Sequence, residues 1–285
     1  MPELPEVEIV RQSLNRQVKN QKIISIQVTN RNLRLKLPKN FEQILKNAVI
    51  EKIQRKSKYL ILVFNNYLYC VIHLGMSGTL HFVGLKKKTT NLSFYGSQSL
   101  PKKHNHIILR FKNFKLIYND PRRFGFFKIL KNKKDYLKFF TRIGPEAISK
   151  NFNKKYLDKI LKNRTKNIKN LLLDQKLVSG LGNIYVNEIL FQAKVDPFKK
   201  SCLINLDENK RIVKYSKIIL KKAIHFGGSS IRDFKGITGK SGNFQSKFKV
   251  YDREKKRCSR NNCSGQISRK IISNRSTFIC SVCQK

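Results

Sequence analysis

Four cysteines near the end of the chain constrain its fold more than any other feature of the sequence. They form two pairs, Cys258-x4-Cys263 and Cys280-x2-Cys283, with sixteen residues between the pairs. This spacing is typical of a zinc ribbon, in which two cysteine knuckles flank a β-hairpin and four thiolates bind one Zn²⁺. Four protein ligands leave no position for water. The pattern therefore predicts one structural Zn²⁺ and a hairpin whose tip carries Ser273–Ser276.

The charge of the chain favours an anionic partner. Its 285 residues include 61 Lys and Arg against 17 Asp and Glu, which gives a formal net charge of +44. Such a surface attracts polyanions, and nucleic acid is the first candidate, although compositional drift toward lysine would raise the charge as well. No apolar run approaches the ~18 residues of a membrane span, and residues 1–20 lack the apolar core of a signal peptide. We expect a soluble cytoplasmic protein.

The hydrophobic pattern changes near residue 131. Before it, short apolar runs are separated by Asn and Gly, as in an antiparallel sandwich or barrel. After it, apolar residues recur at helical spacing. Strands are expected at 23–28, 33–37, 59–64, 67–73, 79–83, 106–111, 114–119 and 126–130, and a polar loop at 84–105. Helices are expected from about Pro5 onward and at 41–47, 135–141, 153–162, 167–177, 184–193 and 207–226.

The N-terminal segment Met1–Glu8 fits two interpretations. If Met1 is removed, the ring nitrogen of Pro2 becomes a free amine one peptide bond from the Glu3 carboxylate. An α-amino group has a pKa of ~7.7–8.0, so part of it is neutral and nucleophilic near neutral pH. Such an amine forms a Schiff base with an electrophilic carbon, and a neighbouring carboxylic acid supplies a proton. The same residues also fit an ordinary helix start, because Pro and Glu suit a first turn.

Three turns also carry candidate functional residues. Gly180–Asn183 joins two helices and places backbone N–H groups where a phosphate binds well, although such turns are often purely structural. His73–Gly78 places Met76 between glycines, and Asp120–Gly125 places Phe124 beside two arginines. Met76 and Phe124 could be ordinary core residues. In a basic protein they also suit an apolar wedge inserted into a duplex.

Taken together, these motifs resemble the formamidopyrimidine-DNA glycosylase family from end to end. The matching segments are Pro2–Glu6, Arg55–Tyr59, His73–Gly78, Asp120–Gly125, Gly180–Tyr185 and the cysteine ribbon. The resemblance implies a bifunctional enzyme that removes 8-oxoguanine and formamidopyrimidines from duplex DNA and then cuts the strand by β- and δ-elimination.

The resemblance also implies a fold and a domain order. The fold is α+β, with an N-terminal antiparallel β-sandwich flanked by helices and a C-terminal helix–two-turn–helix with a zinc-ribbon hairpin. The expected divisions are a catalytic β-sandwich domain at 1–131, a linker at 132–150, a helical domain with a lesion loop at 151–250, and the ribbon at 251–285. The expected partner is damaged double-stranded DNA, bound by a monomer that needs no partner protein.

The functional residues implied by the resemblance fall into three groups. The catalytic residues are Pro2 as nucleophile at the sugar C1′, Glu3 as proton donor, Lys58 in β-elimination, and Arg275 in δ-elimination and phosphate contact. The residues that fill the void left by the flipped base are Met76, Arg122 and Phe124. The further positions at which the family contacts DNA are His104, Arg164, Lys169 and Asn183, together with Arg122.

Two departures from the family pattern leave alternatives open. The first cysteine pair encloses four residues where the family usually has two, and the segment Gly227–Val250, which covers the flipped base in the family, is largely idiosyncratic. One alternative is an endonuclease VIII type of glycosylase that acts on oxidised pyrimidines, although Leu4 and the two turns of the β domain favour the purine branch. The other is a non-catalytic zinc-ribbon protein that binds nucleic acid.

Overall fold

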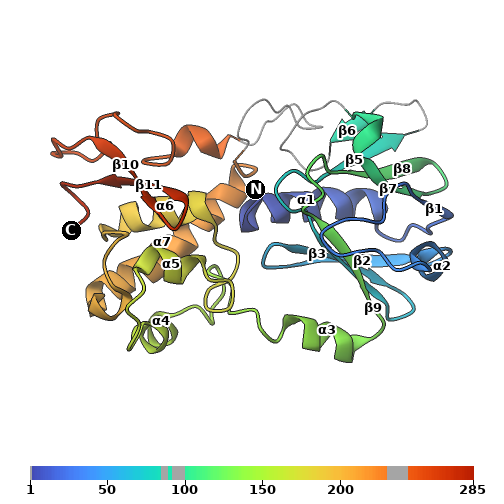
Figure 1. Ribbon diagram of the computed structural model, residues 1–285, viewed down its shortest axis with the longest axis horizontal. Helices are drawn as coiled ribbons and strands as arrows, with labels where there is room; N and C mark the ends of the chain where they lie inside the picture. Colours follow the sequence, from blue (N-terminus) through green and yellow to red (C-terminus); the bar gives the residue numbers. More distant parts are fainter. Residues whose placement is uncertain (1, 85–88, 92–99, 230–242) are drawn as a thin grey trace. The chain divides into compact units, whose positions relative to one another are not determined.

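The computed structural model describes residues 2–84, 89–91, 100–229 and 243–285 (Figure 1). Within these residues the chain forms two compact units. The N-terminal unit comprises Met1–Thr141 and Phe226–Gln245, and the C-terminal unit comprises Arg142–His225 and Ser246–Lys285. No helix in the described part of the chain is long and apolar enough to cross a membrane.

Two antiparallel sheets form the frame of the N-terminal unit (Figure 1). One has the strand order β1 (Ser25–Val28), β7 (Asn105–Arg110), β8 (Phe114–Asn119), β5 (Thr79–Gly84) and β6 (Thr89–Asn91). The other has the order β2 (Ile50–Lys56), β3 (Tyr59–Phe64), β4 (Tyr69–His73) and β9 (Phe126–Leu130). This arrangement confirms the expected sandwich.

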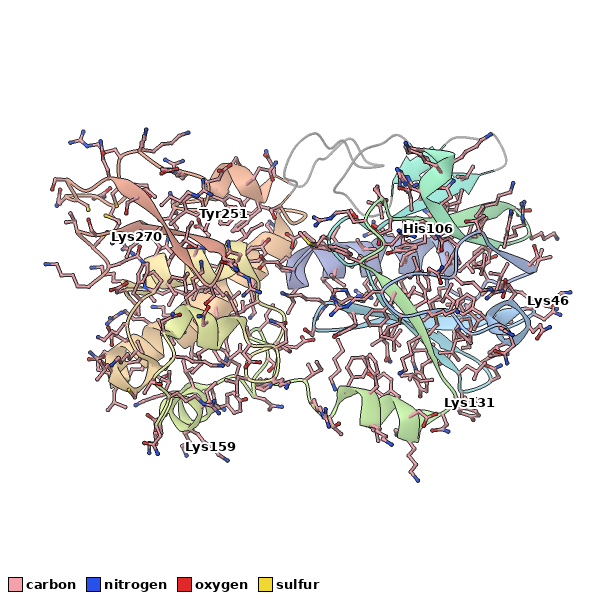
Figure 2. All side chains as sticks on the ribbon, in the orientation of Figure 1. Lys46, His106, Lys131, Lys159, Tyr251 and Lys270 are labelled. Atoms are coloured by element: carbon pink, nitrogen blue, oxygen red, sulfur yellow. The ribbon has the colours of Figure 1, made fainter. Side chains whose placement is uncertain are left out.

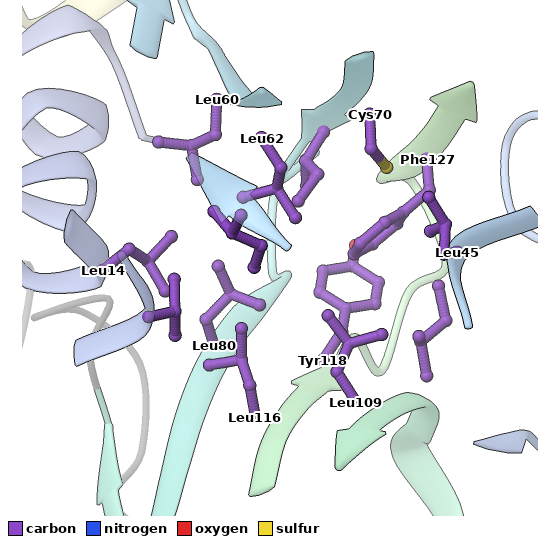
Figure 3. Packing of buried hydrophobic residues seen from close by; sticks show 14 of the residues in the cluster. Leu14, Leu45, Leu60, Leu62, Cys70, Leu80, Leu109, Leu116, Tyr118 and Phe127 are labelled. Carbon is purple, nitrogen blue, oxygen red and sulfur yellow. The ribbon is translucent and has the colours of Figure 1, made fainter. Parts of the chain in front are cut away.

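A single hydrophobic core joins the two sheets and the first helix. Helix α1 (Leu4–Val18) buries Val7, Val10, Leu14 and Val18, whose spacing of three or four residues places them on one face. Leu60 and Leu62 of β3 share this core with residues of the other sheet, among them Leu80, Leu116 and Tyr118 (Figure 3). The core thus fixes the start of α1, and with it Pro2 and Glu3, against the sandwich.

The expected strand at 33–37 is wrong. Leu33 and Leu37 are buried whereas Leu35 is 40% exposed, so the three side chains do not share one face as they would in a strand. The backbone bends here, and the N–H of Leu37 donates to the carbonyl of Arg31. The alternation of leucines and basic residues therefore reflects a loop that sends two leucines into the core.

Strand β2 was not expected from the sequence. Its buried residues are Ile50 and Ile53, three positions apart, because a bulge shifts the pairing with β3 between Ile50 and Lys52. The expected polar loop at 84–105 contains β6 and a short 3-10 turn at Lys102–His104 within its described part. The short helix expected at 41–47 is confirmed as α2 (Phe41–Leu45).

Helices dominate the C-terminal unit, as expected. They are α4 (Lys154–Leu161), α5 (Ile168–Leu173), α6 (Asn183–Ala193) and α7 (Leu206–His225). Asn153 and Asn167 cap α4 and α5 with their side chains. Helix α5 ends at Leu173, before the expected residue 177. Almost all of α6 is buried. Helix α3 (Lys133–Phe140) lies in the expected linker 132–150 and belongs to the N-terminal unit.

The last element is a hairpin of β10 (Ile267–Ile272) and β11 (Arg275–Cys280). Ser273 and Asn274 form its turn with φ of 46° and 59°, a conformation that suits a tight hairpin. The Glu188 carboxylate of α6 accepts backbone hydrogen bonds of 2.9–3.1 Å from Lys249, Val250 and Tyr251. The ribbon is therefore docked on the central helix of its unit.

Candidate active site and nucleic-acid contacts

Pro2 and Glu3 are buried at the start of α1. Glu3, 2% exposed, is the N-terminal cap of the helix and forms a capping box with Glu6. The N–H of Glu3 donates to Glu6 Oε2 at 2.9 Å, and the Glu3 carboxylate accepts from the N–H of Glu6. The Glu3 carboxyl therefore occupies a fixed position beside Pro2.

Glu6 also anchors the segment that follows α7. Its Oε1 accepts hydrogen bonds from the N–H and the hydroxyl of Ser229, at 2.8 and 2.9 Å. Gly228, with φ of 79°, lies so close that an added Cβ would be 3.3 Å from Glu6 Oε1. The expected lesion loop thus begins against the first turn of α1. Residues 230–242 of this expected loop lie outside the described residues.

Lys58 follows a strained residue in the turn between β2 and β3. Ser57 has φ of 56°, and Lys58 is 6% exposed. Arg55 donates to the Ser57 carbonyl and to the Glu8 carboxylate of α1, both at 2.9 Å. Burial raises the pKa of Glu8, but the hydrogen bonds from Arg11 and Arg55 outweigh it, and the pKa is lowered overall. The Glu8–Arg55 pair therefore ties the Lys58 turn to the N-terminal helix.

His73 lies within reach of the Lys58 charge. Burial and then the charges of Lys58 and Arg34 lower the pKa of His73 to about 4. The neutral ring accepts a hydrogen bond at Nδ1 from the N–H of Gly75, at 3.0 Å, and stacks on Phe126. His73 is thus a neutral ring that fixes the start of the Met76 turn.

The two candidate wedge turns lie against each other. Met76 and Phe124 are 43% and 46% exposed, and the Arg122 guanidinium lies 4.7 Å from the centre of the Phe124 ring. Gly75 allows the contact, because a Cβ there would lie 2.5 Å from the nitrogen of Gly125. Met76 and Phe124 are therefore exposed apolar side chains beside an arginine.

Lys169 and Asn183 converge on the tip of the hairpin. The Lys169 ammonium donates to the Ser276 carbonyl and the Thr277 hydroxyl, both at 2.8 Å, and the Asn183 amide donates to the same carbonyl at 3.0 Å. Lys169 is fully buried, and burial followed by the charge of Arg275 lowers its pKa to about 7. The structure thus brings together Lys169, Asn183 and Arg275, with only Arg275 exposed.

The two remaining expected DNA contacts are Arg164 in the C-terminal unit and His104 in the N-terminal unit. Arg164 is exposed just after α4, and its carbonyl accepts from the N–H of Cys202. His104 ends the 3-10 turn of the N-terminal unit, and its carbonyl accepts from the N–H of Asp120 at 3.0 Å. Positive charge is not confined to one patch: Lys46, Lys131, Lys159 and Lys270 are exposed on four different parts of the chain (Figure 2).

The four cysteines have the arrangement of a metal site. All four sulfurs lie within 4.8 Å of one another, and three of the pairs are 3.6–3.7 Å apart. Tetrahedral thiolates at a Zn–S distance of ~2.3 Å have sulfurs ~3.8 Å apart, so the residues fit a metal ion of this kind. Gly265 makes room for the cluster, since a Cβ there would lie 2.7 Å from the Cys280 sulfur.

Comparison with known proteins identifies the family. Residues 1–127 match the formamidopyrimidine-DNA glycosylase N-terminal domain, and residues 143–235 match the H2TH domain of the same enzyme. The chain belongs to the formamidopyrimidine-DNA glycosylase family. Enzymes of that name from Wolbachia pipientis subsp. Culex pipiens and from Zymomonas mobilis are 39% and 40% identical to it, and each match covers 100% of both chains.

Solved structures of the Lactococcus lactis enzyme of this family have the same fold. Its complex with DNA that contains an abasic site has a TM-score of 0.87 and 35% identity, with 100% of each chain covered. The wild-type enzyme with DNA that contains N7-benzyl-Fapy-dG has a TM-score of 0.88 and 35% identity over the same coverage. The α+β fold of two-sheet sandwich, helical unit and cysteine-bearing hairpin is therefore that of the family.

The first knuckle, with four residues between its cysteines, contacts helix α6, which the cysteine spacing alone did not indicate. Arg260, one of the four residues between Cys258 and Cys263, donates to the carbonyls of Phe191 and Gln192 at the end of α6, at 2.5 and 3.2 Å. Its guanidinium also lies 4.6 Å from the centre of the Phe191 ring. Cations suit a helix C-terminus. Arg260 of this four-residue knuckle thus joins the ribbon to the end of α6.

Proposed function

We propose that this DNA glycosylase for oxidised purines works through a Schiff base on Pro2. With Met1 removed, the Pro2 nitrogen attacks C1′ of the damaged nucleotide, the C1′–N bond breaks and the base leaves with the electron pair. The attached nitrogen then gives up its proton, and its lone pair expels the ring oxygen from C1′. The oxygen takes up a proton, and an iminium ion remains. The observation that carries the proposal is the position of Glu3, whose buried carboxyl is fixed beside Pro2 and able to supply the proton.

Lys58 and Arg275 are the candidates for the elimination steps. The iminium acidifies the C2′ proton, and its removal expels the 3′ phosphate. The Lys58 turn is tied to α1 through Arg55 and Glu8, which supports a role close to Pro2. Arg275 is an exposed cation at the hairpin tip, suited to a phosphate oxyanion. A second elimination expels the 5′ phosphate, and water then hydrolyses the iminium, which releases the sugar and regenerates Pro2.

We propose that the four cysteines bind one structural Zn²⁺. The metal supplies no reaction step; it holds the two knuckles and thereby the hairpin. Cys258, Cys263, Cys280 and Cys283 would all serve as ligands, so no position would remain for substrate. The residues that place the hairpin tip are Lys169 and Asn183, through the Ser276 carbonyl.

Damaged duplex DNA is the proposed partner, and the protein is proposed to act as a monomer in the bacterial cytoplasm. Met76, Arg122 and Phe124 are exposed and grouped, which supports their role in filling the gap left by an extruded base. Arg164 and His104 would contact the backbone. Lys169 supports the hairpin and reaches DNA only through it. Affinity would fall steeply with salt because phosphate contacts release counterions.

Borohydride trapping on DNA containing 8-oxoguanine tests the Schiff base. The expected product is a covalent adduct whose peptide map places the DNA on residue 2. A Glu3→Gln variant is expected to excise the base at least tenfold more slowly, since it lacks the acidic proton. An adduct located on a lysine, or no adduct with wild type, would refute the mechanism.

The lesion preference is tested separately. Duplexes with 8-oxoguanine opposite cytosine are expected to be better substrates than duplexes with thymine glycol, measured as excision rates under single-turnover conditions. A clear preference for thymine glycol would assign the chain to pyrimidine lesions while leaving the Pro2 chemistry intact.

A further inference from the structure

Asp120 is a fully buried carboxylate that none of the proposed catalytic steps uses. It directly follows β8 and opens the turn that carries Arg122 and Phe124. Removing a carboxylate from water is costly unless hydrogen bonds replace the lost solvation. The groups that supply those bonds therefore show what the residue is for.

Both carboxylate oxygens of Asp120 accept hydrogen bonds, and the donors belong to the two wedge turns and to Tyr118. Oδ1 accepts from the Ser77 hydroxyl at 2.5 Å and from the N–H of Arg122 at 3.3 Å. Oδ2 accepts from the Tyr118 hydroxyl at 2.8 Å and from the N–H of Gly125 at 2.9 Å. Ser77 is the neighbour of Met76, and Gly125 is the neighbour of Phe124. One carboxylate therefore binds both wedge turns, through a side-chain hydroxyl in the first and backbone N–H groups in the second.

The backbone of Asp120 extends this set to a third segment. Its N–H donates to the His104 carbonyl at 3.0 Å, and its carbonyl lies 2.8 Å from Nε2 of buried His106. His104 is one of the expected DNA contacts. A single residue is therefore bonded to the segments that carry Met76, Arg122, Phe124 and His104.

The glycines of the two turns leave them little freedom to move separately. A Cβ on Gly78 would lie 2.5 Å from the Tyr118 hydroxyl, and one on Gly125 would overlap the same hydroxyl. Tyr118 is 1% exposed and supports both turns from below. The turns are thus packed against each other and against Tyr118, and they share Asp120 as their hydrogen-bond acceptor.

We propose that Asp120 is a positioning residue that holds Met76, Arg122 and Phe124 as one preorganised wedge for the gap left by the extruded base. The inference rests on the proposed void-filling role of those three side chains. A wedge whose backbone is already fixed loses less conformational freedom on insertion than one on two mobile turns. Asp120 itself touches neither the lesion nor the reacting atoms.

An Asp120→Asn variant tests the proposal. Asparagine has the same shape, but its NH₂ group would face one of the two pairs of hydrogen-bond donors. The hydrogen bonds of that pair are then lost. Excision of 8-oxoguanine from a duplex is expected to slow by about tenfold or more, in line with a few kcal/mol of unstacking that the wedge offsets. Borohydride trapping on a single-stranded oligonucleotide with an abasic site, where no gap exists, is expected to change by less than about twofold.

Two further variants keep the test decisive. Ser77→Ala removes a single donor. It is expected to slow excision by a smaller factor than Asp120→Asn, again without a matching loss of trapping. The test therefore stands even if Asp120→Asn fails to fold. Asp135→Asn, in the first turn of α3, is the matched control and is expected to leave both rates unchanged. If Ser77→Ala slowed trapping as much as it slowed excision, the hydrogen bonds between Asp120 and the wedge turns would be merely structural. That result would overturn the proposal.

A double-mutant cycle separates the inference from the function on which it rests. In a Met76→Ala, Phe124→Ala background the wedge is absent, and Asp120→Asn is expected to add less than about threefold. If Asp120→Asn still slows excision by about tenfold in that background, Asp120 does not act through the wedge. If truncating the wedge slows excision while Asp120→Asn alone does not, only the positioning role fails. If the truncated enzyme excises at the wild-type rate, the void-filling role fails and the positioning role with it.

Discussion

The ammonium of Lys169 donates a hydrogen bond of 2.8 Å to the carbonyl of Ser276, the residue that follows Arg275 in the hairpin. Because Lys169 is fully buried, this contact joins α5 to the hairpin away from solvent. The bond gives Lys169 a supporting role, and it makes the stability of this unit depend on the charge of one lysine.

The stability of the C-terminal unit should rise with pH above neutrality because of Lys169. Its pKa falls from 10.5 to about 7 in the folded chain, so between these values the unfolded chain binds more protons. Relative to Lys169→Met, the wild-type free energy of unfolding should increase by on the order of 2 kcal/mol from pH 7 to 9, measured by urea unfolding. Lys159→Met, at an exposed lysine of α4, is the control. Equal slopes for wild type and Lys169→Met would contradict this.

His73 should make the N-terminal unit sensitive to acid. Its pKa is lowered from 6.5 to about 4, so the folded state resists protonation and its stability falls as the pH drops from 6.5 toward 4. His73→Asn keeps an acceptor for the N–H of Gly75 without a titrating ring. Wild type should therefore lose on the order of 2 kcal/mol relative to this variant across that window, seen as a steeper fall in melting temperature. If the melting temperatures of wild type and His73→Asn fell equally between pH 6.5 and pH 4, His73 would not be the source of the acid sensitivity.

The sequence allowed the cysteine cluster and most elements to be predicted because their signals are local. The ligand set of the ribbon follows from cysteine spacing, and the sulfurs do converge. Strand β2 was missed because a bulge replaces the period of two with Ile50 and Ile53 three residues apart. The leucines at 33–37 recur with a period of two, but they lie in a loop and not in a strand.

The supporting contacts of the site could not be predicted, because they join residues far apart in the chain. The donors to Asp120 include two backbone N–H groups and a serine 43 residues away, and a backbone N–H carries no signature in the sequence. A lysine in α5 is normally read as a surface charge, and only the hairpin 107 residues later explains its burial. Motifs thus indicated the candidate residues, and the packing of the structure showed which other residues support them.

Arg55→Lys should uncouple strand cleavage from base excision. Lysine lacks the planar group that binds Glu8 and the Ser57 carbonyl at once, so the turn that carries Lys58 loses its anchor. The rate of strand cleavage after excision should fall by about tenfold, while the excision rate changes less. Arg11→Lys is the matched control, because Arg11 binds Glu8 from within α1, whereas it is Arg55 that also donates to the Ser57 carbonyl. Equal losses in both rates would count against a specific role in placing Lys58.

Removal of zinc should weaken DNA binding more than it disturbs the N-terminal unit. The hairpin with Arg275 depends on the cysteine knuckles, whereas the β-sandwich has a core of its own. Chelation, or Cys283→Ser, should therefore raise the Kd for abasic-site DNA by about tenfold or more at fixed salt, measured by fluorescence anisotropy. Limited proteolysis should leave the fragment that ends near Thr141 intact. Cys202→Ser, at an exposed cysteine outside the ribbon, should bind as wild type. Unchanged affinity after chelation would exclude the ribbon from DNA binding.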